Sequence, residues 1–476
     1  MTGRSYRKLE PGQAWAPHTT LPEPDLKFDS SSTRQRHPHP LLGLKEFGPY
    51  APPPTGDIKV ATITVEGQQA KLYDFLRKLT RAHQPSDRKS YVPPYPGFKE
   101  LFGVDLLPER SAHINLRADA PGDGPDAHER LSLALAGAVT QLQNVRDSWD
   151  VIVLLLPRMW EPLRKSLDGA FDLHDRLKAA AAPLGCPIQM VREASALQFR
   201  LECSMFWRLS IAMLTKAGGV PFRMVQPTEA DTAYVGLAYA IRGGTSNDFV
   251  TCCSQVFDAE GGGFEFIAYN VGADRDLDNP HLTRQEMRTV MARSARLYQR
   301  RRAGAMPARL VVHKPYTWRE DEIDGVFDAW GAVPDIECLH VNTNPGWTGV
   351  ALKPTGSRSR PIPDGWPVTR GSLQYLSGTE ALLWVSGTAQ NVSLHGKNYN
   401  QSQKSLPTPI SFRRWSGQGA LEVPAKEMLA LSKLDWNNDA LYGLTPVTVS
   451  YSQRLSRMIG RVPALPDDSY QFRLFM

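Results

Sequence analysis

FDLHDRLKAAAAPLGCPIQMV (residues 171–191) and LSIAMLTKAGGVPFR (residues 209–223) are the two stretches that decide the fold. The first predicts a helix over its leucine- and alanine-rich half, followed by a short buried strand. The second predicts a helix that ends at Gly218, Gly219 and Pro221, because glycine and proline commonly follow a helix C-terminus. Alternating helices and strands of this length indicate an α/β protein.

Four polar side chains interrupt these regular, mostly apolar stretches: His174, Lys178, Gln189 and Lys216. His174 and Lys178 are four residues apart, so a helix places them on the same face. Taken singly, each of the four is typical of a solvated or hydrogen-bonded polar group. Brought together, they would bind a phosphate, because lysines supply charge while histidine and glutamine supply directed hydrogen bonds.

The order of these residues carries a resemblance to a known family. H-x-x-x-K on a helix, Q on the next strand and K-x-G-G-x-P at the end of the next helix resemble the guide 5′-phosphate pocket of prokaryotic Argonaute proteins. In that family the pocket lies in a MID domain, which precedes a PIWI domain. The resemblance implies that His174, Lys178, Gln189 and Lys216 bind the 5′-phosphate of a short guide.

Composition sets broad limits. A chain of 476 residues predicts two or three domains, and a net charge of +6 is a mild bias toward polyanions. Five cysteines without CxxC spacing argue against a disulfide scaffold or a zinc site. No run reaches 18 apolar residues and no apolar segment follows the N-terminal charges, so we expect a cytoplasmic protein without a membrane span.

The chain divides into three predicted parts. Residues 1–55 are rich in proline, histidine, serine and arginine and predict an extended arm, in which GLKEFGPY (residues 43–50) resembles the entry segment of short Argonautes. Residues 56–225 predict a Rossmann-like MID domain, and no GxGxxG or Walker A motif indicates a nucleotide cofactor there. Residues 226–476 begin with three consecutive strands, which suits an RNase H-like PIWI domain. With no room for a PAZ domain, the chain resembles a short prokaryotic Argonaute.

Two positions lack the carboxylates that a cleaving PIWI domain uses to hold two metal ions. Ala238 stands where the first strand of the family carries aspartate, and Pro315 stands where the aspartate of H-R-D is expected. We therefore expect that the chain itself is not an enzyme. An active guide-directed nuclease that uses Asp248, Asp258 or Glu265 instead remains an alternative, and so does an α/β enzyme acting on a phosphorylated small molecule.

The end of the chain predicts a metal site. In many prokaryotic Argonautes the terminal carboxylate reaches the MID pocket and coordinates a divalent cation that also touches the guide. The apolar ending YQFRLFM predicts a buried terminus. The resemblance thus implies a Mg²⁺ held by the Met476 carboxylate and the Gln189 carbonyl oxygen, since a carboxylate beside phosphate needs a bridging cation. The alternative is an ordinary buried C-terminal strand.

Arginines offer candidate contacts to a nucleic-acid backbone. A predicted helix near residues 281–302 carries a run of them, although such runs are typical of solvated helix faces. The run consists of Arg284, Arg288, Arg293, Arg296, Arg300, Arg301 and Arg302. In the family, basic side chains of the last helix approach the first guide phosphates, which implies this role for Arg454.

The resemblance also implies a function. A short Argonaute binds a small 5′-phosphorylated guide RNA and a complementary single-stranded DNA target, in this case without cutting. Its partner is a separate APAZ-containing protein with a TIR or sirtuin-like effector that degrades NAD, bound as a heterodimer that oligomerises on activation. Target pairing would act as the allosteric ligand in defence against viruses and plasmids.

Overall fold

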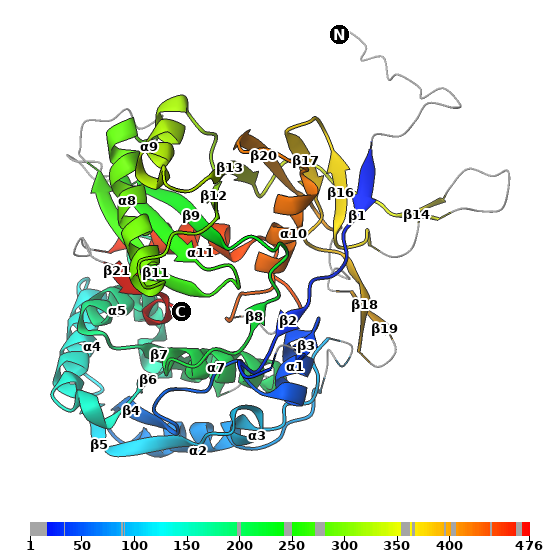
Figure 1. The fold of residues 1–476 in the computed structure, drawn as a ribbon. Helices are drawn as coiled ribbons and strands as arrows, with labels where there is room; N and C mark the ends of the chain where they lie inside the picture. Colours follow the sequence, from blue (N-terminus) through cyan, green and yellow to red (C-terminus); the bar gives the residue numbers. More distant parts are fainter. Residues whose placement is uncertain are drawn as a thin grey trace, which may run out of the picture.

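A computed structural model gives the fold of the chain as two lobes linked by an N-terminal arm (Figure 1). It describes residues 17–32, 34–86, 89, 91–197, 201–241, 250–271, 281–353, 362–363, 367–394, 397–400, 406–437, 440–462 and 469–476. The expected α/β class is confirmed, because each lobe is built from a sheet with helices on both faces.

The smaller lobe contains a four-stranded parallel sheet. Its strands, in spatial order, are β5 (Leu106–Leu116), β4 (Ile58–Val65), β6 (Val151–Leu156) and β7 (Ile188–Arg192). Every residue of β6, VIVLLL, is buried, as expected for a central parallel strand covered on both faces. Alternate residues of β6 belong to two different core clusters, so the strand separates two helical layers.

Helices cover both faces of this sheet. The α-helices are α2 (Gln69–Leu79), α3 (Phe98–Phe102), α4 (Ala127–Gln143), α5 (Leu173–Ala181), α6 (Glu193–Ala196) and α7 (Glu202–Lys216). Short 3₁₀ turns are η1 (Arg146–Ser148), η2 (Arg158–Arg164) and η3 (Ala182–Leu184). Helices α2, α3 and α7 pack on one face, and α4 and α5 pack on the other.

The larger lobe contains a ten-stranded mixed sheet. In spatial order its strands are β1 (His18–Thr20), β16 (Ser372–Tyr375), β17 (Glu380–Leu383), β20 (Ile410–Ser416), β13 (Asp335–Asn342), β12 (Arg309–Lys314), β9 (Thr232–Ile241), β10 (Val250–Phe257), β11 (Gly263–Val271) and β21 (Ser469–Gln471). Strands β9, β10 and β11 form an antiparallel meander, whereas β12 runs parallel to β9 and β13 runs parallel to β12.

Two pairs of helices cover opposite faces of the large sheet. Helices α8 (Arg284–Arg301) and α9 (Glu320–Trp330) pack against Val235 and Leu237 of β9. Helices α10 (Glu422–Leu431) and α11 (Val447–Arg461) pack on the other face, where Tyr234 points. Gly236 allows α11 to lie this close, because a Cβ there would stand 1.9 Å from the carbonyl oxygen of Thr448.

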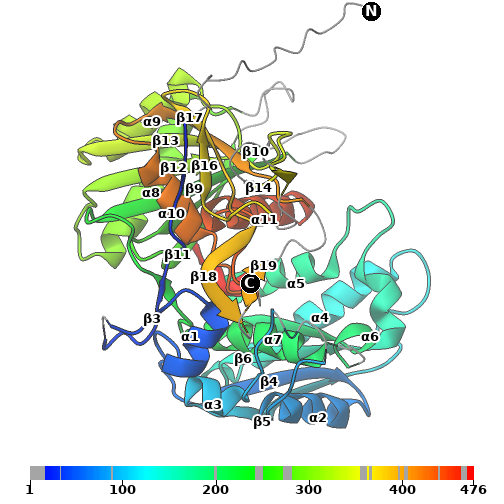
Figure 2. The same cartoon turned by 90° about the vertical axis from the view of Figure 1, so that its right-hand side faces the viewer.

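The N-terminal arm touches both lobes (Figure 2). Strand β1 extends the large sheet by pairing with β16, and helix α1 (Pro40–Phe47) packs against α3 of the smaller lobe. Between them, β2 (Leu26–Lys27), β3 (Arg36–His37) and β8 (Arg223–Met224) form a three-stranded sheet at the junction. Glu23 forms ion pairs with Arg370, at 2.8 Å, and with Lys433, at 2.6 Å.

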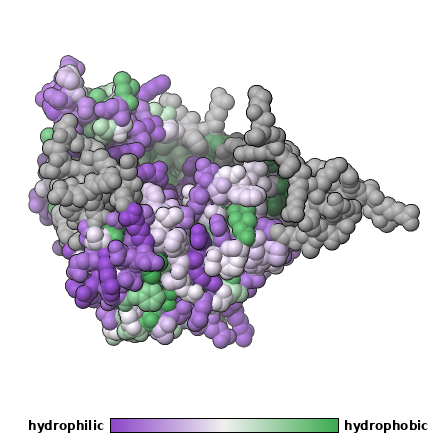
Figure 3. All heavy atoms as spheres, turned by 90° about the horizontal axis from the view of Figure 1, so that it is seen from above, coloured by the Kyte–Doolittle hydropathy of each residue, from purple (hydrophilic) through white to green (hydrophobic). Residues whose placement is uncertain are grey.

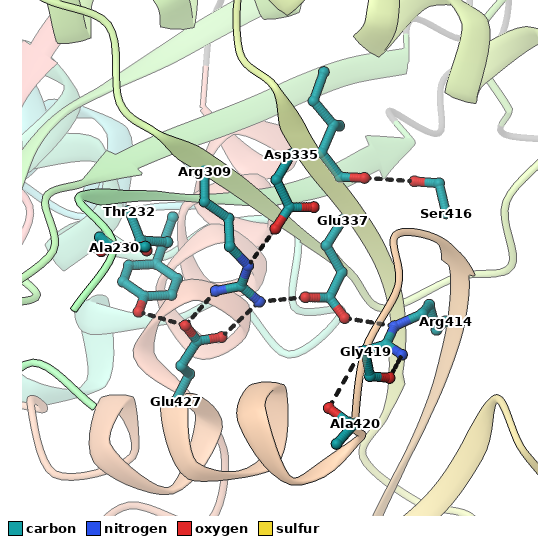
Figure 4. A network of polar contacts seen from close by, with 12 residues as sticks. Ala230, Thr232, Arg309, Asp335, Glu337, Arg414, Ser416, Gly419, Ala420 and Glu427 are labelled. Carbon is teal, nitrogen blue, oxygen red and sulfur yellow. Dashed lines mark hydrogen bonds and ion pairs between the residues drawn. The ribbon is translucent and has the colours of Figure 1, made fainter. Parts of the chain in front are cut away.

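A buried ionic network joins the central strands of the large sheet to α10 (Figure 4). The guanidinium of Arg309 on β12 donates to Glu427 of α10 and to Glu337 of β13. Glu337 also accepts from Arg414 of β20, at 2.7 Å. Because the side chains of Glu337 and Glu427 are only 2% and 0% exposed, this network holds four elements together where water does not compete.

Smaller elements complete the chain. Two hairpins, β14 (Leu352–Lys353) with β15 (Ile362–Pro363) and β18 (Thr388–Leu394) with β19 (Lys397–Asn400), extend from the larger lobe, and the chain ends in η4 (Phe472–Leu474). On the face in Figure 3, hydrophilic residues predominate and hydrophobic ones form small separate patches. Within the described residues, every helix is too short or too polar to cross a lipid bilayer.

Candidate functional site

The four residues singled out in the sequence come from α5, β7 and α7 of the smaller lobe. Helix α5 begins at Asp172, whose side chain accepts a hydrogen bond from the backbone of His174 at 3.0 Å and thereby caps the helix. This cap places His174 and Lys178 one turn apart. Helix α7 ends just after Lys216, where Gly218 adopts a left-handed φ of 92° that reverses the chain.

Buried hydrogen bonds connect these residues to each other and to the end of the chain. The Nζ atom of Lys216 donates to Oε1 of Gln189 at 2.9 Å. The Nζ atom of Lys178 donates to the main-chain oxygens of Phe475, at 2.9 Å, and of Met476. Three side chains and two main-chain oxygens, from residues separated by up to 298 positions in sequence, therefore come together where the lobes meet.

His174 and Arg454 lie at the solvent-facing side of this cluster. The side chain of His174 is 45% exposed, and its Nδ1 atom is 3.4 Å from Oδ1 of Asp175. The side chain of Arg454, on α11, is 47% exposed and stands 4.0 Å from Asp435. Arg454 is close enough to Lys178 for its charge to lower the pKa of that lysine. Both side chains can therefore reach an anion that enters from solvent.

Burial disfavours the charged form of the Lys178 and Lys216 side chains. Burial lowers the pKa of Lys216 to about 7. The pKa of Lys178 is also well below its usual range, first because of burial and then because of the nearby charge of Lys216. The charge of Lys178 in turn is the largest cause of the lowered pKa of His174. These cationic groups repel one another in a place that excludes water, and a multivalent anion would stabilise their charged forms.

A cavity of about 300 Å³ opens next to Gln189, between the smaller lobe and the loop that carries Asn437. Its lining combines apolar side chains with Arg192 and Arg208. Sequence analysis missed Arg192, Arg208 and Asn437. The first two occupy polar positions at the end of a buried strand and on an amphipathic helix, a signal too common to single them out.

The residues expected to hold Mg²⁺ can be tested against the chemistry of their donors. Gln189 offers a carbonyl oxygen, and Phe475 and Met476 offer main-chain oxygens, which are the hard ligands that Mg²⁺ prefers. Met476 is only 5% exposed, so its carboxyl end lies inside the protein beside Lys178. The donor set fits the ion, although Lys178 donates to the oxygens of Phe475 and Met476 and Lys216 donates to that of Gln189. Nearby, Asp172, His174 and Asp175 also form a group with ligand atoms within 4.8 Å of one another.

The large lobe shows the surroundings of the positions that lack carboxylates. Ala238 is buried in β9 opposite Cys253 of β10, and Pro315 directly follows β12. Two of the alternative carboxylates have other partners: Asp258 accepts from Arg223 at 2.6 Å, and Glu265 pairs with Arg301 at 2.5 Å. Asp248 lies outside the described residues.

A parallel-sheet lobe and a mixed-sheet lobe that meet at buried lysines define a two-lobed α/β protein, and known proteins share this architecture. No protein-family model matches the chain. A curated relative, a protein argonaute of Cereibacter sphaeroides, is 22% identical over 474 residues, covering 94% of this chain and 56% of that protein.

Solved structures give the same fold. Clostridium butyricum Argonaute, bound to a guide DNA and a 19-mer target DNA, matches with a TM-score of 0.69 and 16% identity, covering 96% of this chain and 54% of that one. Aquifex aeolicus Argonaute matches with a TM-score of 0.62 and 15% identity, covering 98% of this chain and 56% of that one. Drosophila Piwi matches with a TM-score of 0.62 and 13% identity, covering 96% of this chain and 55% of that one. The chain therefore has the fold of Argonaute proteins, and it spans about half the length of these relatives.

One sequence-based prediction is wrong. We expected that the chain is not an enzyme, but its fold is that of the Argonaute family, whose RNase H-like PIWI domain is a nuclease. The prediction depended on Ala238 and Pro315 alone. Two positions without a carboxylate do not exclude a metal site assembled from other residues, because such a site depends on where oxygens meet in space.

Proposed function

We propose that the chain is an Argonaute that binds a small 5′-phosphorylated guide, RNA in the first instance, and uses it to recognise complementary single-stranded DNA. The observation that carries the proposal is the convergence of Lys178, Lys216 and Gln189 at the junction of the lobes. In this proposal residues 56–225 form the MID domain and residues 226–476 form the PIWI domain. The order β11-β10-β9-β12-β13 supports the second assignment, since it is the topology of an RNase H-like sheet.

The 5′-phosphate would be held by the site residues in distinct ways. Lys178 and Lys216 supply charge, His174 and Gln189 supply directed hydrogen bonds, and Arg454 contacts the phosphates that follow. Phosphate binding would restore full charge to lysines whose pKa is lowered by burial. A Mg²⁺ held by Gln189 and the carboxyl group of Met476 would neutralise the remaining negative charge.

A double substitution tests the site. We expect Lys178→Met with Lys216→Met to weaken binding of 5′-phosphorylated RNA by at least about 100-fold, since two charge-assisted contacts contribute about 1.5–3 kcal/mol each. The fold should survive, because methionine keeps the apolar stem and removes a charge that burial disfavours. Lys78→Met with Lys99→Met is the matched control, because these lysine side chains are 49% and 66% exposed and pair with Glu202 and Asp105, which are not site residues. Equal affinity for 5′-phosphorylated and 5′-hydroxyl RNA in the unmodified chain would refute the proposal.

The same complexes answer the question of cleavage. Because the fold belongs to a nuclease family, labelled target DNA is incubated with guide-loaded protein in Mg²⁺ and in Mn²⁺. A cut at a fixed distance from the guide 5′ end would identify guide-directed hydrolysis. A phosphorylated small molecule as the natural ligand is the competing function, and it predicts that purified protein carries no short nucleic acid.

The biological setting is part of the proposal. The resemblance of residues 43–50 to the entry segment of short Argonautes supports a cytoplasmic immune system against viruses and plasmids, with an APAZ-containing partner that degrades NAD through a TIR or sirtuin-like domain. A neighbouring gene for such a partner, and a heterodimer on co-expression, are the expected results. NAD loss that requires both guide and target would link recognition to the effector.

A further inference from the structure

Helix α8 borders a groove of about 700 Å³ in the larger lobe. Arg293, Arg296 and Arg300 line it from the helix, together with Gln299. Ile267 of β11 and Ser469 of β21 form the facing wall. No acidic residue is among the described residues that line the groove.

The arginines of α8 fall into two groups. Arg284 pairs with Asp328 at 2.7 Å, Arg301 pairs with Glu265 at 2.5 Å, and Arg302, just after the helix, pairs with Asp231 at 3.2 Å. These three serve the fold, because each ties the helix to a neighbouring element. The second group lines the groove and consists of Arg293, Arg296 and Arg300, of which Arg296 and Arg300 are exposed to solvent.

The spacing of the groove arginines suits a chain of phosphates. Positions 293, 296 and 300 lie on one helical face and span seven residues, or about 10.5 Å along the axis. A row of this length can contact more than one phosphate of a nucleic-acid strand at once. Guanidinium groups bind phosphate oxygens in a bidentate manner, which lysine cannot do.

Helix α8, which borders the groove, and helix α11, which carries Arg454, lie on opposite faces of the large sheet (Figure 1). Ile267 belongs to the core beneath α8 and α9, whereas Arg454 is carried by α11 on the other face. A guide held at Lys178 and Lys216 therefore leaves the groove open. We propose that the groove formed by Arg293, Arg296, Arg300 and Gln299 is a second nucleic-acid site, which binds the phosphodiester backbone of a single strand without reading its sequence.

The inference does not depend on the proposed function, and the test keeps them separate. The probe is a labelled 20-nucleotide single-stranded DNA with a 5′-hydroxyl group, which a 5′-phosphate pocket does not select. We expect Arg296→Gln with Arg300→Gln to weaken its binding about ten-fold in 50 mM salt. The slope of log affinity against log salt should fall by about 1.4, since each lost contact to a single-strand phosphate removes about 0.7.

Two controls make the result specific. Arg81→Gln with Arg319→Gln removes the same charge from exposed positions elsewhere and should leave the slope unchanged. The Lys178→Met, Lys216→Met variant should bind the probe as the unmodified chain does, even if it has lost 5′-phosphorylated RNA. Equal slopes for the two arginine variants would overturn the proposal. Displacement of the probe by poly-glutamate at a lower charge concentration than by unlabelled DNA would overturn the choice of nucleic acid as the ligand.

Discussion

Lys216 is buried to 1% exposure beneath the entry to the candidate site, and its Nζ atom donates a hydrogen bond to the neutral side chain of Gln189. Burial lowers the pKa of Lys216 to about 7. In the free protein this amine is therefore neutral above about pH 7, whereas in the unfolded chain it stays charged to about pH 10.4. Since the unfolded state binds the extra proton, the group makes the free protein more stable as pH rises through this window.

Guide binding should show the opposite trend with pH. A phosphate favours the charged ammonium, so binding takes up a proton above pH 7. We expect the affinity for 5′-phosphorylated RNA to fall by up to about ten-fold per pH unit between pH 7.5 and 9, because the guide phosphate, with a second pKa of about 6, stays fully charged there. Binding titrations at each pH, with 5′-hydroxyl RNA as the reference, measure this effect.

Two variants of the same residue separate this cause from others. Lys216→Arg carries a guanidinium that stays protonated, so its affinity should change less with pH. Lys216→Met has no proton to take up at this position and should bind weakly with a flatter profile. A profile as steep in Lys216→Met as in the unmodified chain would assign the proton uptake to another group.

Among the secondary-structure elements, the strands and α10 meet at the Arg309 network. Its central guanidinium satisfies two carboxylates that are almost completely buried (Figure 4). Burial raises the pKa of Glu427 despite the opposing charge of Arg309, which shows that the ion pair only partly offsets the loss of water. Removing one partner of the network would therefore leave a buried charge unpaired and lower the free energy of unfolding.

Arg309→Met should destabilise the larger lobe by about 3–5 kcal/mol, because it leaves Glu337 and Glu427 buried without their common partner. Adding Glu427→Gln to this variant should recover part of the loss, since it removes one unpaired charge. Urea denaturation followed by tryptophan fluorescence measures both variants. Arg284→Met, which breaks an ion pair whose arginine is 54% exposed, is the control and should cost far less stability, because water screens exposed ion pairs. Equal losses for Arg309→Met and Arg284→Met would show that the network adds little stability.

The elements also show how far sequence patterns reach. β6 and β9 could be predicted, because VIVLLL and TAYVGLAYAI are runs that only a buried strand accommodates. β5 could not, because it lies at the edge of its sheet, buries only Leu106 and Ala112, and contains Pro108 next to an irregularity in register. Helix α10 is harder to predict, because a proline interrupts the local helical pattern, although Pro424 lies in the first turn, where a helix tolerates proline.

The candidate site divides in the same way. His174 and Lys178 could be placed on one face from their spacing, and the resemblance to Argonautes added Gln189 and Lys216. The contact of Lys178 with the main-chain oxygens of Phe475 and Met476 joins residues about 300 positions apart, and no local pattern encodes it. Long-range contacts of this kind depend on how whole lobes pack, which periodicity and propensity do not describe.

At the scale of the whole molecule, the N-terminal arm links the two lobes. Glu23 is held between Arg370 and Lys433, both with fully buried side chains, and Lys433 also donates to the main-chain oxygens of Pro24 and Pro38. The hydrophobic side chains that follow, Leu26 and Phe28, are completely buried in the shared core. Because the candidate site is built from both lobes, the arm stabilises the geometry on which that site depends.

Glu23→Gln should loosen this attachment. Burial alone would raise the pKa of Glu23, but Arg370 and Lys433 together hold it below its usual range. Its contribution to stability is thus fully present above about pH 4.3, the value for an unfolded glutamate, and is lost as pH falls through the lower folded-state pKa. At neutral pH, removing this charge leaves two buried cations short of a partner and should cost about 3 kcal/mol or more.

Limited proteolysis of the arm at neutral pH, followed by mass spectrometry, measures this change directly. The rate of cleavage follows the fraction of molecules in which the arm is detached. We expect Glu23→Gln to be cut within residues 17–40 at least about ten-fold faster than the unmodified chain, and to bind 5′-phosphorylated RNA more weakly in proportion to the open fraction. Asp25→Asn, an exposed carboxylate two positions away, is the matched control and should behave like the unmodified chain. If Glu23→Gln were cut faster while guide affinity stayed unchanged, the arm would stabilise itself and not the site between the lobes.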